Sequence, residues 1–322
     1  AATKPYWLGQ QIAVIGAGTM GHALALVHAL GGQRVSLHDS SPEVLRSAPA
    51  LIEAASATLV DAGAVSASDA RTALERITYT ESLPDAVRDA DLVVEAVVEK
   101  ADVKRIVYDE IDRHAPEYAI IASNTSYLDP FPLIPAARQS RAAIAHWYTP
   151  PYIIDLVDLA PGPETAPEVI ETLHALYQGF GKAPLVFDRL VPGYIANRLQ
   201  QALNLECLRM IDEGWVSAED IDQSIRHGLV HRLAVLGHMK KLDFTGLEMA
   251  RLGIEGGTYE PPSNMLQSPT LDRLIAAGRT GVRAGAGFYD YGDASADALF
   301  RERDLKLLRL KAQLKDLEGE DT

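Results

Sequence analysis

The chain has 322 residues, 47% of them hydrophobic, and its 30 basic and 44 acidic side chains give a formal net charge of -14. This length and apolar content predict two domains of ordinary size, each with a core of its own. The acidic balance argues against binding to nucleic acid or to an anionic membrane surface, because both favour basic proteins.

From the first 30 residues we expect neither a secretory signal nor a membrane segment. Ala1–Gln10 lacks the basic and apolar regions of a secretory signal, and the apolar run Ile12–Leu30 is interrupted by glycines and histidines. The one cysteine, Cys207, cannot form an intramolecular disulfide and has no metal-ligand spacing around it. We therefore expect no metal site, no membrane span and a reducing cytoplasmic location.

Short β-type runs alternate with longer helical stretches through the first half of the chain, as in a parallel sheet covered by helices. The predicted strands are Gln11–Ile15, Arg34–His38, Asp91–Ala96, Ala119–Ser123 and Ala142–His146. Further on, the pattern predicts a buried strand around Ile153–Leu159, a helix over Pro167–Gly179 and a strand over Pro184–Asp188.

The last third of the chain has a helical pattern. Ile195–Glu213 is a long amphipathic stretch, Ser217 has the sequence context of a helix N-cap, and spaced leucines after Leu307 predict an amphipathic terminal helix. The predicted fold class is therefore α/β: a Rossmann-type doubly wound sheet over residues 1–189, followed by an all-α domain over residues 190–322.

A dinucleotide fingerprint joins the first predicted strand to the first helix. Its residues are Gly16, Ala17, Gly18, Thr19, Met20 and Gly21. In a G-x-G-x-x-G turn the glycines allow a tight turn, close approach of the pyrophosphate and close helix packing. Asp39 ends the second strand, where an acid binds the adenosine ribose and repels a 2′-phosphate, so NAD is predicted over NADP. A glycine-rich turn without a nucleotide is the alternative.

Several ordered motifs across nearly the whole chain resemble the 3-hydroxyacyl-CoA dehydrogenase superfamily, which includes the L-gulonate dehydrogenase/λ-crystallin branch and dehydrogenases of small hydroxy acids. Besides the fingerprint they are Glu95–Glu99 with Lys104, Ser123–Ser126, His146–Pro151, Gly193–Arg198 and Gly285–Tyr289. The resemblance implies an NAD-dependent dehydrogenase and a homodimer formed through the helical domain. It also places Glu99, Lys104 and Ser126 near the nicotinamide, Asn197 at the reacting centre, and Arg283 near the cofactor, where the family usually has lysine.

His146 is the candidate general base. An alcohol that loses a hydride must also lose its hydroxyl proton, and histidine titrates in the useful range. His146 ends a predicted strand, at the sheet edge where open α/β sheets bind ligands. A histidine satisfied by a backbone carbonyl is the structural alternative.

The family pairs this histidine with a glutamate twelve residues later, where this chain has the shorter Asp158. Asp155 is the alternative partner, and a surface acid on an edge strand is the structural alternative for Asp158. Ser126 and Asn197 are expected to bond the substrate oxygen, unless they serve as helix-cap or turn residues.

Two departures from the family pattern concern the substrate. Thr149 stands at the position of a family asparagine, and no lysine occurs between Lys4 and Lys100, where cations for coenzyme A phosphates are expected. We therefore predict a small hydroxy acid as substrate. The alternatives are a true 3-hydroxyacyl-CoA dehydrogenase and a noncatalytic, crystallin-like NAD-binding protein.

Overall fold

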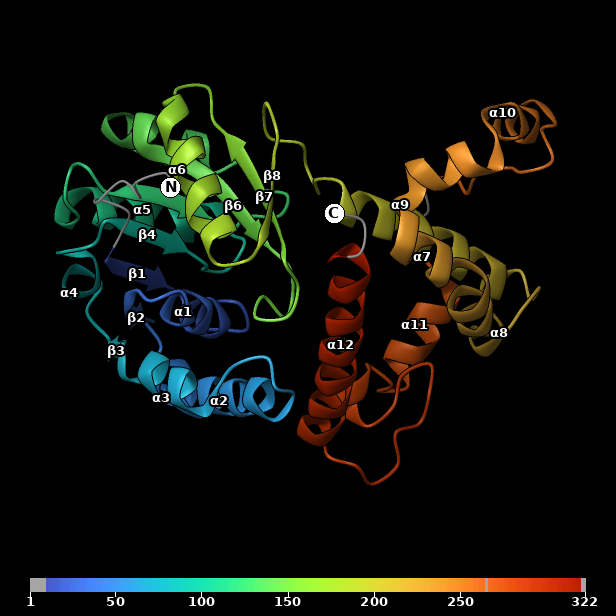
Figure 1. The fold of residues 1–322 in the computed structure, drawn as a ribbon, viewed down its shortest axis with the longest axis horizontal. Helices are drawn as coiled ribbons and strands as arrows, with labels where there is room; N and C mark the ends of the chain where they lie inside the picture. Colours follow the sequence, from blue (N-terminus) through green and yellow to red (C-terminus); the bar gives the residue numbers. More distant parts are fainter. Residues whose placement is uncertain (1–9, 264–265, 320–322) are drawn as a thin grey trace. The chain divides into compact units, whose positions relative to one another are not determined.

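The computed structural model describes residues 10–263 and 266–319, and the chain separates into two compact units, Ala1–Tyr194 and Ile195–Thr322. The first unit contains an eight-stranded sheet in the order β3-β2-β1-β4-β5-β6-β7-β8 (Figure 1). Its strands are β1 Gln11–Ile15, β2 Arg34–His38, β3 Ile77–Thr80, β4 Leu92–Glu95, β5 Ile120–Ser123, β6 Ala142–Trp147, β7 Leu156–Pro161 and β8 Ala183–Val186. Neighbouring strands pair in parallel except β6 and β7, which are antiparallel.

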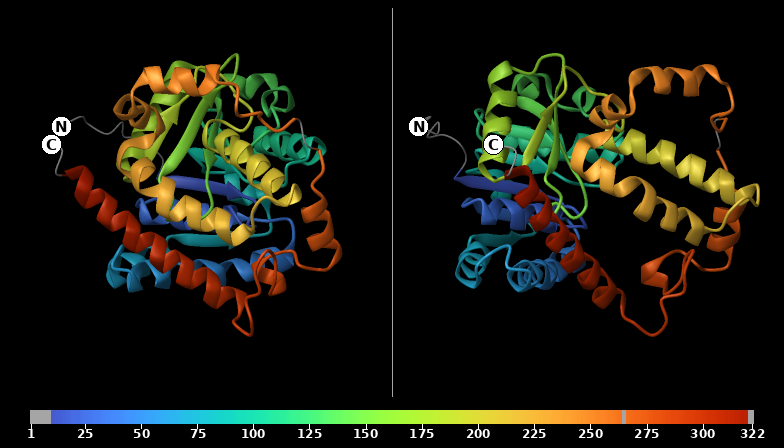
Figure 2. Two further views of the ribbon diagram at one scale, coloured as in Figure 1. Left: turned by 90° about the vertical axis from the view of Figure 1, so that its right-hand side faces the viewer. Right: turned by 45° about the vertical axis from the view of Figure 1, so that its right-hand side comes forward.

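Helices cover both faces of this sheet, as two further views also show (Figure 2). They are α1 Gly21–Leu30, α2 Pro42–Asp61, α3 Ala67–Glu75, α4 Leu83–Val87, α5 Ala101–His114 and α6 Pro167–Gly179, with 3-10 turns η1 Phe131–Leu133 and η2 Ala136–Arg141. One core layer joins alternate residues of β1 to Val87 and Tyr108 of α4 and α5. On the other face His28 of α1 packs against Tyr177 of α6. Because both faces are covered, β1 and β4 are almost entirely apolar and buried.

The second unit is mainly helical, and its described residues also form the isolated bridges Gly281–Ala286 and Ala286–Asp290. Its elements are α7 Ala196–Asp212, α8 Ala218–Ser224, the π-helix η3 Ile225–Leu229, α9 Val230–Thr245, α10 Leu247–Glu255, α11 Pro269–Ala276, the 3-10 turn η4 Val282–Ala284 and α12 Ala296–Gly319. Ser217 begins α8 with the expected cap: its hydroxyl accepts from the Asp220 N–H, and Asp220 accepts from the Ser217 N–H.

The structure confirms the predicted fold class, a Rossmann-type sheet followed by a helical C-terminal domain. The compact units divide after Tyr194, whereas the sequence placed the boundary after residue 189. The sequence did not predict β3, and β7 begins at Leu156 because residues 151–153 form a turn. Within the described ranges, no helix is both long and apolar enough to cross a membrane.

Candidate active site

The fingerprint residues form a tight turn between β1 and α1 that only glycine can make. Gly16 has φ +98°, and a Cβ on it would lie 2.5 Å from the Ala96 carbonyl oxygen. A Cβ on Gly21 would lie 1.6 Å from the Gly16 carbonyl oxygen. Both glycines therefore let the turn lie close to β4 and α1.

The outer side of this turn suits a pyrophosphate. A Cβ on Gly18 would meet nothing within 4 Å, and Gly18 and Thr19 are both exposed. No side chain caps the N-terminus of α1, and its first turn contains no acid. Backbone N–H groups and the positive end of the helix are thus available to an anion. The residues present fit the dinucleotide that the fingerprint predicts.

Asp39 lies just after β2, beside the same turn. Its Oδ2 accepts from the Ala17 N–H at 2.8 Å, and its Oδ1 accepts from the Ser41 N–H at 2.8 Å. These two bonds fix the carboxylate at the edge of the site, and each oxygen keeps acceptor capacity for a ribose hydroxyl. The fixed negative charge would also repel a 2′-phosphate.

His146, Asp158 and Ser126 come together at the end of β6. His146 Nδ1 lies 3.3 Å from Asp158 Oδ2, and its Nε2 lies 3.2 Å from Ser126 Oγ. His146 and Asp158 are both buried, whereas Ser126 is partly exposed. Asp155, the alternative partner, instead forms an ion pair with Lys182 at 3.3 Å. The imidazole is therefore held between one carboxylate and one hydroxyl.

Two tyrosines hold the His146 ring. Tyr194 stacks on it with centroids 4.5 Å apart and planes at 23°, and Tyr148 meets it edge-on at 4.7 Å. Tyr194 has φ +51°, which is uncommon for a residue with a side chain, and its hydroxyl donates to the Thr125 carbonyl at 2.6 Å. These contacts fix the plane of the imidazole.

Glu99 organises the loop that carries Ser126. Its Oε1 accepts from the Thr125 hydroxyl and from three successive backbone N–H groups, those of Ser126, Tyr127 and Leu128. Partial burial alone would raise the pKa of Glu99, but the Thr125 hydroxyl and the Lys104 ammonium lower it overall. The carboxylate is thus kept charged and holds the loop that carries Ser126.

Behind this loop lies a buried ionic cluster. Lys104 Nζ donates to Glu95 Oε1 at 2.8 Å and lies 3.2 Å from Glu99 Oε2. Glu95 Oε2 also accepts from the hydroxyls of Tyr108 and Ser123, each at 2.6 Å. Lys104 and Glu95 are 1% and 0% exposed, so Lys104 acts here as the counterion of two carboxylates.

Three further predicted residues are Met20, Asn197 and Arg283. Met20 precedes α1, and its sulfur accepts from the Thr149 hydroxyl at 2.9 Å, which links the fingerprint turn to the loop after β6. Asn197 lies in the first turn of α7 and Arg283 in η4, where its guanidinium lies over the Phe300 ring at 4.9 Å. Both belong to the second unit. The approach of Asn197 to the reacting centre and of Arg283 to the cofactor stays a prediction.

The sequence analysis gave no role to four residues that shape the site: Glu95, Asn124, Tyr148 and Tyr194. Asn124 Oδ1 accepts from the Trp147 N–H at 2.8 Å and so ties the end of β5 to β6. All four lie inside the recognised motifs. Asn124, Tyr148 and Tyr194 are each within three positions of a predicted site residue. Their position in those motifs was the one available indication.

An open, mostly parallel sheet with this dinucleotide turn, and a paired histidine beyond it, defines a Rossmann-type dehydrogenase. A family model described as "3-hydroxyacyl-CoA dehydrogenase, NAD binding domain" matches residues 11–190, and one described as "3-hydroxyacyl-CoA dehydrogenase, C-terminal domain" matches residues 193–291. The chain belongs to the 3-hydroxyacyl-CoA dehydrogenase family, as its motifs predicted. It is an NAD-dependent oxidoreductase of that family.

Similar proteins cover almost the whole chain. The 5-formyl-3-hydroxy-2-methylpyridine 4-carboxylate 5-dehydrogenase of Mesorhizobium japonicum is 31% identical over 96% of this chain and 99% of its own. The L-carnitine dehydrogenase of Streptomyces coelicolor is 34% identical over 95% and 96%. A solved structure of the pyridine carboxylate enzyme, described as an NAD+-dependent dismutase, has a TM-score of 0.84 at 31% identity and covers 95% of this chain and 99% of that one.

Proposed function

We propose that this protein oxidises the secondary alcohol of a small hydroxy acid, or reduces the corresponding ketone, with His146 as the general base or acid. The observation that carries the proposal is the position of His146 between Asp158 and Ser126, at 3.3 and 3.2 Å. NAD, when bound, supplies the hydride acceptor. The turn Gly16–Gly21 and Asp39 would hold its pyrophosphate and ribose.

Each side chain has a part in moving one proton. Ser126 donates a hydrogen bond to the substrate oxygen and, with Asn197, fixes the carbinol carbon. His146 Nε2 takes the hydroxyl proton as the alcohol is oxidised, and Asp158 stabilises the imidazolium that results. Asp158 also keeps the neutral ring protonated at Nδ1, which leaves the Nε2 lone pair directed toward Ser126 and the substrate.

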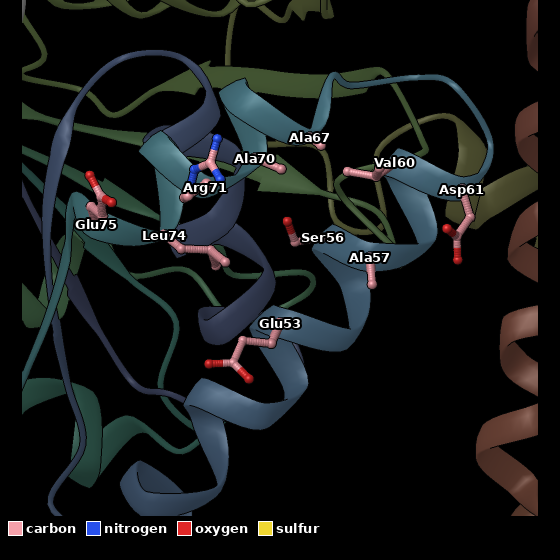
Figure 3. Close-up of a pocket in the computed structure, with 10 residues that line it drawn as sticks. All are labelled: Glu53, Ser56, Ala57, Val60, Asp61, Ala67, Ala70, Arg71, Leu74 and Glu75. Atoms are coloured by element: carbon pink, nitrogen blue, oxygen red, sulfur yellow. The ribbon is translucent and has the colours of Figure 1, made fainter.

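The charges beside α2 and α3 favour a small substrate over a coenzyme A thioester. A cavity of about 530 Å³ lies between these helices (Figure 3), in the region where the resemblance places coenzyme A contacts. Its charged lining residues are Glu53, Asp61, Glu75 and Arg71. Coenzyme A phosphates would meet more carboxylates than cations there, which disfavours their binding.

The names of two relatives specify small carboxylates and not coenzyme A esters: a pyridine carboxylate and L-carnitine. A substrate carboxylate needs a cation or several donors. The candidate cations of the second unit are Arg198 on α7 and Arg232, Lys240 and Lys241 on α9.

The helical unit supports a homodimer. No described residue of α7, α9 or α10 is buried, although these helices present large apolar side chains such as Leu199, Val235 and Ile254. A second copy of the chain would cover such faces.

We also propose that the protein acts in the reducing cytoplasm, where Cys207 remains a thiol.

A substrate panel tests the proposed function. Initial rates with NAD are compared for gulonate, 3-hydroxybutyrate, carnitine, aromatic hydroxy acids and 3-hydroxybutyryl-CoA, and each active substrate is repeated with NADP. We expect the highest kcat/KM with a free acid and NAD. A kcat/KM for the CoA ester that exceeds every free acid tenfold would instead establish the ordinary hydroxyacyl-CoA reaction. Turnover of none of them would favour the noncatalytic alternative.

A further inference from the structure

One carboxylate oxygen serves two donors in the catalytic pair. Asp158 Oδ2 accepts a short hydrogen bond from the Tyr148 hydroxyl, and the same oxygen lies 3.3 Å from His146 Nδ1. Asp158 is 0% exposed, and within the described residues its other oxygen, Oδ1, has no hydrogen-bond partner. The Tyr148 phenol is therefore the nearer of the two donors to this buried charge.

The geometry explains how the short acid is held. Charge-assisted N–H···O bonds are usually about 2.7–2.9 Å long, so the His146–Asp158 contact is a long one. Asp158 is one methylene shorter than the glutamate that the family resemblance implies here. Tyr148, directly after β6, donates its hydroxyl to this carboxylate, and its ring packs edge-on against His146.

We propose that Tyr148 is a positioning residue that acts through Asp158: its hydroxyl fixes the carboxylate and withdraws part of its charge from His146, so that the imidazole stays neutral to lower pH. This proposal rests on the proposed role of His146 as the base. It adds a residue that sets the pH range in which His146 can accept a proton from the substrate.

The direction of the effect follows from charge. A hydrogen bond from the phenol stabilises the Asp158 carboxylate most when the neighbouring imidazole is neutral. When the imidazole is protonated, its positive charge already stabilises the carboxylate, so the phenol adds less. Without the phenol, the His146–Asp158 pair gains its next proton at higher pH, whichever partner carries it. Loss of the hydroxyl therefore raises the apparent pKa of the pair.

The other ionisable groups around the imidazole keep one charge state in the neutral range. Burial, with the Asp158 carboxylate close by, raises the pKa of both Tyr148 and Tyr194, which stay neutral phenols. The pKa of Glu99 is lowered, so it stays an anion. The Tyr127 phenol lies on the loop that carries Ser126.

The test is a titration of Tyr148→Phe, which removes the hydroxyl and keeps the ring. The imidazole Cε1 proton of His146 is followed by NMR against pH in cofactor-free protein and assigned by its absence from His146→Asn. We expect the midpoint to rise by about one pH unit, the scale of a hydrogen bond to a charged group. The acidic limb of kcat/KM should move in the same direction.

Two controls make the result specific. Tyr118→Phe removes an exposed phenol from the loop before β5 and should keep the wild-type midpoint. In an Asp158→Asn background, Tyr148→Phe should no longer shift the His146 midpoint, because the acid through which it acts is gone. An unchanged midpoint in Tyr148→Phe, or the same shift in both backgrounds, would overturn the proposal. Wild-type turnover of His146→Ala would refute the proposed base and leave this titration result intact.

Discussion

Asp158 lies directly opposite His146 in the antiparallel register of β6 and β7, with Oδ2 3.3 Å from Nδ1. Directly opposed residues of an antiparallel pair project to the same face of the sheet. The ladder between two buried strands therefore sets the acid against the imidazole. The reversed direction of β7, the one antiparallel pairing in the described sheet, is what brings a residue twelve positions later to this point.

Asp158→Asn tests this pairing. The amide keeps the size of the side chain but cannot stabilise an imidazolium, so we expect kcat to fall about a hundredfold or more, within the range of general acid–base catalysis. The matched control is Asp155→Asn, which removes the partner of Lys182 and should keep near wild-type turnover. Steady-state kinetics of both variants decide the matter. A larger loss for Asp155→Asn would move the partner role to Asp155.

Asp39→Asn tests cofactor choice. The substitution keeps one acceptor oxygen, which can serve either the Ala17 or the Ser41 N–H, and removes the charge that repels a 2′-phosphate. We expect weaker NADH binding and a smaller ratio of NADPH to NADH dissociation constants, measured by cofactor fluorescence. Asp85→Asn, an exposed acid on α4, should leave that ratio alone. The same ratio in Asp39→Asn as in the wild type would contradict the assignment.

Glu95→Gln tests the buried ionic cluster. It leaves the Lys104 ammonium, 1% exposed, with Glu99 as its remaining carboxylate at 3.2 Å. We expect the free energy of unfolding to fall by on the order of 3 kcal/mol, as when one partner of a buried ion pair is removed. Glu110 pairs with Arg113 near the surface of α5, the helix that also carries Lys104. Glu110→Gln should therefore lower the free energy of unfolding by less than about 1 kcal/mol. Urea unfolding that shows equal losses would argue against a stabilising cluster.

His28 should make the first unit sensitive to acid. Burial lowers its pKa to about 4, although its hydrogen bond with Gln33 at 2.6 Å opposes the shift. The unfolded chain binds this proton near pH 6.5, so stability is complete above pH 6.5 and is lost as the pH falls toward 4. The loss is about 3 kcal/mol, from 2.5 pKa units at 1.36 kcal/mol each.

Urea unfolding at pH 7 and pH 4 measures this loss. His28→Asn should lose less stability than the wild type between the two pH values, by about the same 3 kcal/mol. His114→Asn, on a half-exposed part of α5, serves as control and should follow the wild type. Parallel losses in His28→Asn and the wild type would show that His28 does not titrate in this way.

The sheet could be predicted where a strand is buried on both faces. Ile12–Ile15 and Ile120–Ser123 are apolar runs ending at turn residues, and both were placed within one residue. β3 was missed because Ile77 is followed by Thr-Tyr-Thr, with two exposed positions, so its apolar pattern is weak. β8, the other edge strand, is more exposed but was predicted because its sequence is apolar.

The site could be predicted as a set of motifs but not as a network. His146, Asp158 and Ser126 were expected to act together, and the structure places them in contact. The donors of Glu95 come from α5 and β5, and no local pattern records which side chains meet across a core. For the same reason Tyr148 could be seen beside His146 in the sequence, while its bond to Asp158 depended on the β6–β7 register.

His146→Ala tests most directly whether His146 moves the substrate proton. Its kcat with the best substrate of the panel and its NADH dissociation constant are measured together. We expect turnover to fall at least about a hundredfold, the usual scale for loss of a general base, while NADH binds nearly as in the wild type. Wild-type turnover in a folded His146→Ala protein would contradict the account.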